Sequence, residues 1–185
     1  MKKIFAALAL IFAGHTLVFA QDVRVVDYTN ELAQNLGGRT GLGVEYISYR
    51  GFDENSEIPA LTVRYWIDDN VSVEAQLGWS SAKTRDVLFL GGKFLAIIKN
   101  FKTINIYASA FGGGGYANNK GSYGNEQSEV FKFGAGLGAE WFVVDRLSLS
   151  FEGGLEWMFN TNGNIGNSFG IFGDLVNRAG VRFYW

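Results

Sequence analysis

The chain has 185 residues and a formal net charge of −2, and 48% of its residues are hydrophobic. It contains no cysteine, which excludes disulfide bonds, thiolate metal sites and a lipid-anchored lipoprotein. It also lacks the excess of basic residues by which proteins bind phosphate backbones, so we expect no nucleic-acid partner.

The N-terminus has the pattern of an export signal. Lys2 and Lys3 precede an apolar run of about ten residues, roughly half the length that a membrane-spanning helix needs. Val18 and Ala20 fit the positions that a signal peptidase reads, so the sequence predicts a signal peptide over residues 1–20, cleaved after Ala20. Residues 21–37 are expected to form a periplasmic leader, either docked at the mouth of the folded domain or lying as a short helix on the membrane surface.

From residue 38 onward, apolar residues recur at every second position, which is the period of a β-strand. A single proline with 25 glycines and 16% aromatic residues suits many strands joined by tight turns. Each segment has about ten residues or more, as a tilted membrane strand requires. The expected strands are Arg39–Arg50, Ile58–Ile67, Val71–Ser81, Val87–Ile98, Thr103–Tyr116, Ser128–Val143, Leu147–Phe159 and Phe169–Trp185. The predicted fold is all-β: one domain, residues 38–185, forming an eight-stranded antiparallel up-and-down transmembrane β-barrel.

The predicted connections alternate in length. The tight ones span residues 68–70, 99–102 and 144–146. The longer or more polar ones span residues 51–57, 80–86, 112–127 and 160–168. Short turns at one end and longer loops at the other are typical of outer-membrane barrels, whose turns face the periplasm.

Charged residues fall on the opposite parity from the apolar ones, so an outward apolar face places the charges in the lumen, where ions must pair. Arg64 and Glu74 are equally spaced from Asp69, and a tight turn there sets them opposite each other on adjacent strands. The predicted lumen residues are Glu45, Arg64, Glu74, Lys93, Lys132, Glu140, Glu152, Glu156, Arg178 and Arg182. Asp174 is expected nearer the outer rim.

A soluble barrel such as a lipocalin is the main structural alternative, because its apolar face turns inward and its charges face water. Two features favour the membrane barrel. The apolar face recurs in every segment and leaves no clear edge strand. Aromatic residues also lie near strand ends, as in the girdles of membrane barrels, at Tyr65, Trp79, Trp141, Trp157 and Trp185.

Together with this topology, the final residues Phe183-Tyr184-Trp185 resemble the small eight-stranded outer-membrane barrels, the family of the transmembrane domain of outer membrane protein A and of outer membrane protein X. The resemblance covers residues 38–185. It implies a location in the bacterial outer membrane, in contact with its lipid and lipopolysaccharide. It also implies that Phe183 and Trp185 form a signal read by the barrel assembly machinery, although Trp185 stands where the family usually has Phe.

The sequence offers little for catalysis. Its one histidine, His15, lies in the predicted signal peptide, whereas the lipid A-modifying enzymes built on small barrels use a histidine. We therefore expect no enzyme activity, no catalytic residue, no cofactor and no metal site. Glu152 and Glu156 are interpreted as ion-pairing residues, and Asp68-Asp69-Asn70 as an ordinary turn rather than a loose calcium site. The glycine run 112–115 lacks a phosphate-loop pattern and is interpreted as a flexible strand end, or room for a bulge, before the longest loop.

Two functions remain open. One is a structural or surface-interaction barrel whose polar loops, such as residues 118–127, contact an extracellular ligand. The other is a narrow channel for small or apolar solutes. An eight-stranded barrel encloses only enough room for side chains, and large inward residues such as Trp66, Tyr107 and Phe111 favour a lumen plugged by side chains.

Overall fold

The structure is a computed structural model that describes residues 35–49, 56–81, 85–121, 124–160, 168–172 and 178–185. The predicted signal peptide, most of the predicted leader and Asp174 lie outside these residues. The strands are β1 (Thr40–Tyr49), β2 (Ser56–Trp66), β3 (Val71–Ser81), β4 (Arg85–Phe101), β5 (Ile104–Gly121), β6 (Gly124–Val144), β7 (Leu147–Asn160), β8 (Ser168–Phe172) and β9 (Arg178–Tyr184). Within the described residues, no helix is long and apolar enough to cross a membrane.

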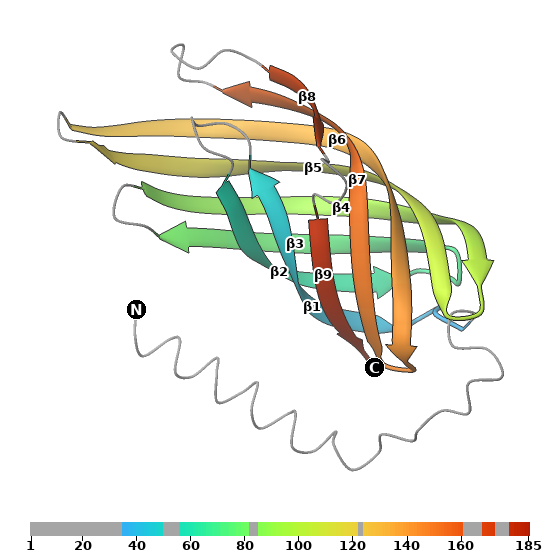
Figure 1. The fold of residues 1–185 in the computed structure, drawn as a ribbon. Helices are drawn as coiled ribbons and strands as arrows, with labels where there is room; N and C mark the ends of the chain where they lie inside the picture. Colours follow the sequence, from blue (N-terminus) through green and yellow to red (C-terminus); the bar gives the residue numbers. More distant parts are fainter. Residues whose placement is uncertain (1–34, 50–55, 82–84, 122–123, 161–167, 173–177) are drawn as a thin grey trace, which may run out of the picture.

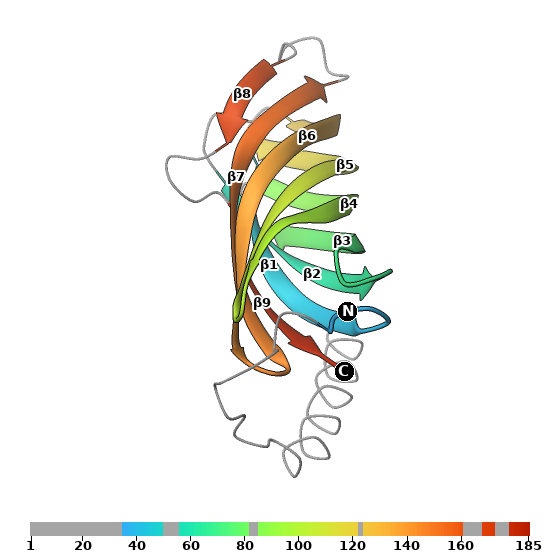
Figure 2. The same cartoon turned by 90° about the vertical axis from the view of Figure 1, so that its right-hand side faces the viewer.

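The strands form one closed antiparallel sheet. From β1 to β7, each strand pairs with the next along the chain, and β9 pairs with β7 on one side and β1 on the other. Because β8 also pairs with β7, β8 and β9 together occupy the position of the eighth strand. Figures 1 and 2 show the sheet curving round until β9 lies beside β1. The predicted eight-stranded up-and-down barrel is confirmed.

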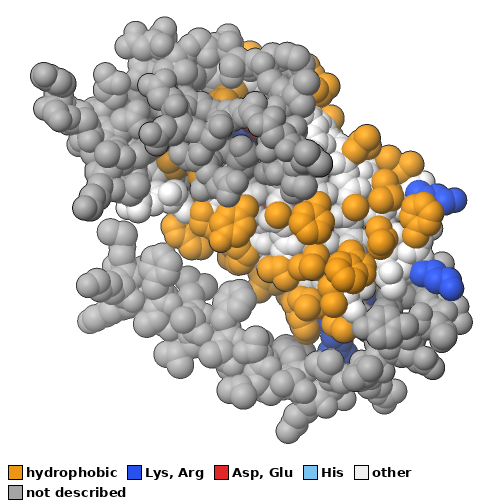
Figure 3. All heavy atoms as spheres, viewed as in Figure 1, with side chains coloured by type: hydrophobic (Ala, Val, Ile, Leu, Met, Phe, Trp, Pro, Cys, Tyr) orange, Lys and Arg blue, Asp and Glu red, His pale blue; other side chains and the backbone are white. Residues whose placement is uncertain are grey.

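Strand alternation decides which side chains face inward. Along β3, buried and exposed residues alternate from Ser72 to Trp79. Large apolar side chains are exposed on the outside, including Leu90 at 66% and Leu137 at 62%. Figure 3 shows hydrophobic side chains gathered over a broad area of the face in view, with basic groups at its margin. The predicted outward apolar face is confirmed.

The long connection predicted over residues 112–127 is wrong, because most of it is strand. The β5–β6 ladder runs without a register shift to the pair Gly121–Gly124, so the glycine run 112–115 is regular strand rather than a flexible end or a bulge. Neighbouring rings fill the space that side chains would take at two of these glycines: a Cβ on Gly113 would lie 2.6 Å from the Phe89 ring, and one on Gly114 would lie 3.1 Å from the Phe131 ring. The register shifts of β4 and β6 occur instead near the opposite end, at Ile97/Lys99 and Phe142/Val144.

The seam between β1 and β9 closes the barrel. Thr40 and Trp185 exchange two backbone hydrogen bonds, of 3.2 and 3.0 Å. Gly43 permits the close approach, since a Cβ there would overlap the carbonyl oxygen of Val181 and lie 3.1 Å from the Cα of Arg182. The seam therefore fixes the strand that sends Arg182 and Tyr184 into the lumen.

Candidate functional site: a charged layer inside the barrel

All ten charged residues predicted to face the lumen are buried. Their exposed fractions range from 0% for Arg64 and Glu140 to 7% for Glu156. We call this set the charged layer; its carboxylates are Glu45, Glu74, Glu140, Glu152 and Glu156, and its cations are Arg64, Lys93, Lys132, Arg178 and Arg182. Five acids and five bases make the layer neutral when every group is ionised. Among the described residues, these positions are buried on the inner face, in keeping with strand parity.

The predicted pair of Arg64 and Glu74 is present at the centre of the layer. The two residues are direct register partners on β2 and β3. The Arg64 Nε donates to Glu74 Oε2 at 2.8 Å, and its Nη2 lies 2.7 Å from the same oxygen. Arg182, on β9, adds a further contact of 2.7 Å from its Nη2 to Glu74 Oε2. Two guanidinium groups therefore converge on one carboxylate. These three groups by themselves carry a net positive charge.

Glu140 supplies the balancing charge from β6. Arg64 Nη1 donates to Glu140 Oε2 at 2.9 Å, and Arg182 Nη1 donates to Oε1 at 3.3 Å. Two hydroxyl groups complete the shell of this carboxylate, Ser148 at 2.6 Å and Tyr184 at 2.8 Å. The two arginines and two glutamates thus form a cross-linked square that joins β2, β3, β6 and β9.

Lys93 extends the network from β4. Its Nζ lies 2.8 Å from Glu45 Oε1, 3.1 Å from Glu152 Oε2 and 3.6 Å from Glu74 Oε1. Gln76 bridges two of the same carboxylates by donating to Glu74 at 2.8 Å and to Glu45 at 3.3 Å. Lys93 therefore has three acidic neighbours, and its position does not depend on any single one of them.

The remaining members are more loosely paired. Arg178 lies 3.6 Å from Glu152 and 3.9 Å from Glu156, and Lys132 lies 3.4 Å from Glu156. Aromatic rings support both cations: the Arg178 guanidinium is 3.7 Å from the centroid of Phe111, and Lys132 Nζ is 5.0 Å from that of Phe89. The energetic cost of burying these two cations is offset by contacts with ring faces as well as with carboxylates.

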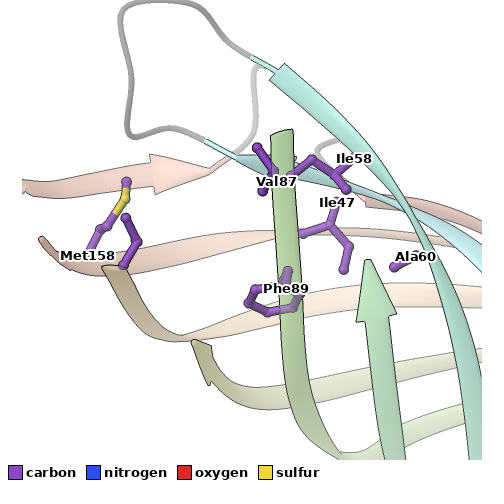
Figure 4. Close-up of a cluster of buried hydrophobic side chains, with 7 residues drawn as sticks. Ile47, Ile58, Ala60, Val87, Phe89 and Met158 are labelled. Carbon is purple, nitrogen blue, oxygen red and sulfur yellow. The ribbon is translucent and has the colours of Figure 1, made fainter. Parts of the chain in front are cut away.

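Apolar side chains pack beyond the charged layer, at the end of the barrel that carries the β1–β2, β3–β4 and β5–β6 connections, which we call the loop end. The cluster consists of Ile47, Ile58, Ala60, Val87, Phe89, Val130 and Met158. Figure 4 shows members of this cluster pointing toward one another from different strands. These positions share the parity of the charged residues, for example Ile47 with Glu45, so the sequence carried the signal for them.

A second apolar cluster lies at the other end, which carries the β2–β3, β4–β5 and β6–β7 turns and which we call the turn end. It consists of Leu36, Trp66, Phe142 and Tyr184, with Ile97 packed against it. Leu36 precedes β1 and is 0% exposed. Sequence reasoning did not assign Leu36 this role, because a single leucine outside the alternating pattern gives no periodic signal.

The turn after β2 holds Leu36 in place. Asp69 Oδ1 accepts hydrogen bonds of 2.8 Å from the amides of Leu36 and Gly37. Gly38 adopts a φ of 80°, which returns the chain to β1, and its amide donates to the Trp66 carbonyl at 2.9 Å. Asp68 caps its own turn by accepting from the amides of Asn70 and Val71. The two carboxylates therefore serve the backbone, as the turn interpretation requires.

The carboxylates and cations of the charged layer engage one another across the barrel interior. Each carboxylate of the charged layer lies within 4 Å of a cation. In the part of the chain that the structure describes, no group of three or more His, Cys, Asp or Glu residues could hold a metal ion. Trp185, one of the two predicted assembly residues, is 54% exposed outside the barrel, and Phe183 is half-buried on the same face.

Comparisons with known proteins add a relation of fold. No family model matches the sequence, and no curated protein matches it. The N-terminal β-barrel domain of OprF from Pseudomonas aeruginosa aligns with a TM-score of 0.61 and 11% identity, over 80% of this chain and 98% of that one. Neisserial surface protein A, from Neisseria, aligns with a TM-score of 0.50 and 13% identity, over 78% of this chain and 95% of that one. This chain therefore has the fold of the small eight-stranded outer-membrane β-barrels.

Proposed function

We propose that this protein is a non-enzymatic β-barrel of the bacterial outer membrane, with a structural or surface-interaction role and a lumen that is closed to solutes. The observation that carries the proposal is the division of side chains across the wall. Apolar residues are exposed on the outside, whereas the ten charges inside neutralise one another. This arrangement is the reverse of that in a water-soluble protein. The hydrocarbon of a bilayer favours it, because unpaired backbone groups at an open sheet edge and unpaired charges are both costly there.

The closed lumen follows from three stacked layers of side chains. Apolar clusters lie near both ends, and the charged layer lies between them, which supports a lumen occupied by side chains. A solute would have to separate cross-linked ion pairs that span the barrel. The alternative function, a narrow channel for small or apolar solutes, requires that these layers open.

Planar-bilayer recording of the purified protein separates the two functions. We expect no stepwise conductance, because the ions inside the barrel bind each other and a passing solute would have to separate them. An open porin added afterwards to the same bilayer must give steps, so that silence reflects the closed barrel. Reproducible unitary conductance from the protein alone would favour the channel.

The proposed partners of the protein are outer-membrane lipid and lipopolysaccharide around the barrel wall, the barrel assembly machinery, and an extracellular ligand of the loops. We also propose that export removes residues 1–20, with cleavage after Ala20. The intact mass of protein isolated from outer membranes tests the cleavage site directly. A mass that includes residue 20 would contradict it.

Replacing Phe183 and Trp185 together with alanine is expected to impair assembly more than folding. We propose that the two aromatic side chains are read during membrane insertion, whereas the strand pairing of β9 rests on backbone hydrogen bonds with β1 and β7. Levels of the variant in outer membranes should fall, while the purified variant still refolds in detergent. If the variant reaches normal levels in cells, Phe183 and Trp185 do not act as an assembly signal.

A further inference from the structure

The connection between β4 and β5 differs in charge from the other two tight turns. The structure shortens the predicted connection 99–102 to Lys102 and Thr103, so Lys99 lies near the end of β4, and both lysines are exposed. Within the ranges that the structure describes, neither lysine forms an ion pair. The acids of the neighbouring turns are already engaged, because Asp69 holds Leu36 and Asp145 pairs with Arg39 at 3.1 Å. Two positive charges that have no acidic partner among the described residues therefore project at this point of the turn end.

Apolar side chains surround the two lysines on the outer face. Ile98 is 59% exposed and Phe101 is 54% exposed. Lys99 Nζ stands 5.9 Å from the centroid of the Phe101 ring. On the adjoining strands, Ile104 pairs with Trp141, and both are exposed on the same face. The cations thus lie where the apolar belt of the barrel ends.

The backbone of the turn is also unusual. Lys102 has a φ of 42°, and among the described residues it is the non-glycine residue with a positive φ. Glycine, asparagine and aspartate adopt this left-handed conformation at lower cost than lysine does. The ladder is irregular just before it, between Ile97 and Lys99. The two-residue connection between β4 and β5 requires such a conformation, and it holds a lysine, rather than one of the favoured residues, exposed at the turn.

We propose that Lys99 and Lys102 bind the phosphate of an anionic glycerophospholipid whose acyl chains lie against Ile98, Phe101 and Ile104. The ammonium groups supply two point charges for the headgroup, and the exposed apolar side chains match the acyl region beneath it. This inference rests on the proposed membrane function, which places the tight turns at the periplasmic face. The lipid therefore belongs to the periplasmic leaflet.

Trp141 provides a local optical probe of this site, because its strand position adjoins Ile104. The full exported chain is reconstituted in phosphatidylcholine vesicles that contain brominated phosphatidylglycerol or, separately, brominated phosphatidylcholine. Bromine quenches tryptophan on contact, and subtracting the signal of W141F isolates the contribution of Trp141. We expect brominated phosphatidylglycerol to quench Trp141 at a several-fold lower mole fraction than brominated phosphatidylcholine, and added salt to reduce the difference.

The double variant K99Q/K102N separates lipid binding from a structural role. It should lose the preference for phosphatidylglycerol, since each lysine near an anionic surface strengthens association roughly five-fold. Asparagine suits the left-handed backbone at residue 102, so the variant should remain at least as resistant to urea as the wild type. The matched control K120Q removes one lysine near the opposite end of β5 and should keep the preference.

The outcomes separate this inference from the proposed function. Equal quenching by the two brominated lipids, or an unchanged preference in K99Q/K102N, would overturn the lipid site while leaving the membrane barrel intact. An absence of quenching by either lipid would overturn the membrane location and the lipid site together. Loss of the preference in K120Q as well would reveal a general effect of charge and would also overturn the site.

Discussion

Replacing Arg64 with methionine is expected to lower the free energy of unfolding by about 3–5 kcal/mol. Arg64 is fully buried and contacts Glu74 at 2.7 Å and Glu140 at 2.9 Å. Without it, the charged layer holds one more acid than bases. Arg182 remains near both carboxylates and limits the loss. Urea unfolding in lipid vesicles measures the change.

A double-mutant cycle identifies the origin of that loss. E74Q alone should also be destabilising, because it leaves the facing guanidinium groups of Arg64 and Arg182 with less negative charge. The double variant R64M/E74Q should lose less than the sum of the single variants, by about 1 kcal/mol or more. Additive losses would mean that the two residues do not interact and would undo the cross-linked network.

An exposed ion pair serves as the matched control. Arg39 contacts Asp145 at 3.1 Å, but their side chains are 27% and 38% exposed. R39M should therefore cost about 1 kcal/mol or less, because water screens the pair and solvates the remaining acid. If R39M costs as much as R64M, the effect reflects the loss of any arginine rather than burial of the charge.

The sequence alone was sufficient to predict the fold and the membership of the charged layer, because both depend on a local rule. In a barrel wall, successive side chains point to opposite faces, so each inward residue is readable from its neighbours. The pairing of Arg64 with Glu74 was also predictable from the sequence, because one tight turn joins their strands. The position of that turn fixes which residues of the two strands lie opposite each other, and it does so independently of how the barrel closes.

The remaining contacts of the layer depend on closure and were not predictable in this way. Arg182 reaches Glu74 across 108 positions in the chain, and Arg64 reaches Glu140 across 76. Those meetings require the stagger of all strands around the barrel, which no local pattern encodes. The role of Leu36 depends likewise on the space left at the turn end once Trp66, Phe142 and Tyr184 are in place.

The strand extension through residues 112–115 shows a different limit. Glycine runs ordinarily weaken strands, so the sequence predicts a flexible strand end, or room for a bulge, at this run. The structure places the rings of Phe89 and Phe131 over Gly113 and Gly114, where they occupy the room that side chains would need. Aromatic residues on neighbouring strands therefore make glycine the fitting residue, a dependence that lies outside the segment itself.

Replacing Leu137 with arginine is expected to cost about 2–4 kcal/mol in a lipid bilayer. Leu137 lies mid-strand in β6, on the outer face, and is 62% exposed. If this face contacts hydrocarbon, the guanidinium group must leave water or drag water into the bilayer. If the face contacted water, as in the soluble alternative, arginine at so exposed a site would change stability by about 0.5 kcal/mol or less. Equilibrium unfolding in urea with vesicles present measures the difference.

The control uses the same face at the margin of the belt. Ile67 follows β2 at the turn end and is 54% exposed, so I67R makes an equivalent aliphatic-to-arginine change where the side chain can reach the headgroup region. Its cost should be about 0–1 kcal/mol, because the penalty for a charge falls toward the interface. Equal small losses for L137R and I67R would contradict the assigned membrane face. A larger loss for L137R in the bilayer is expected because only the mid-strand position lies too deep for its charge to reach water.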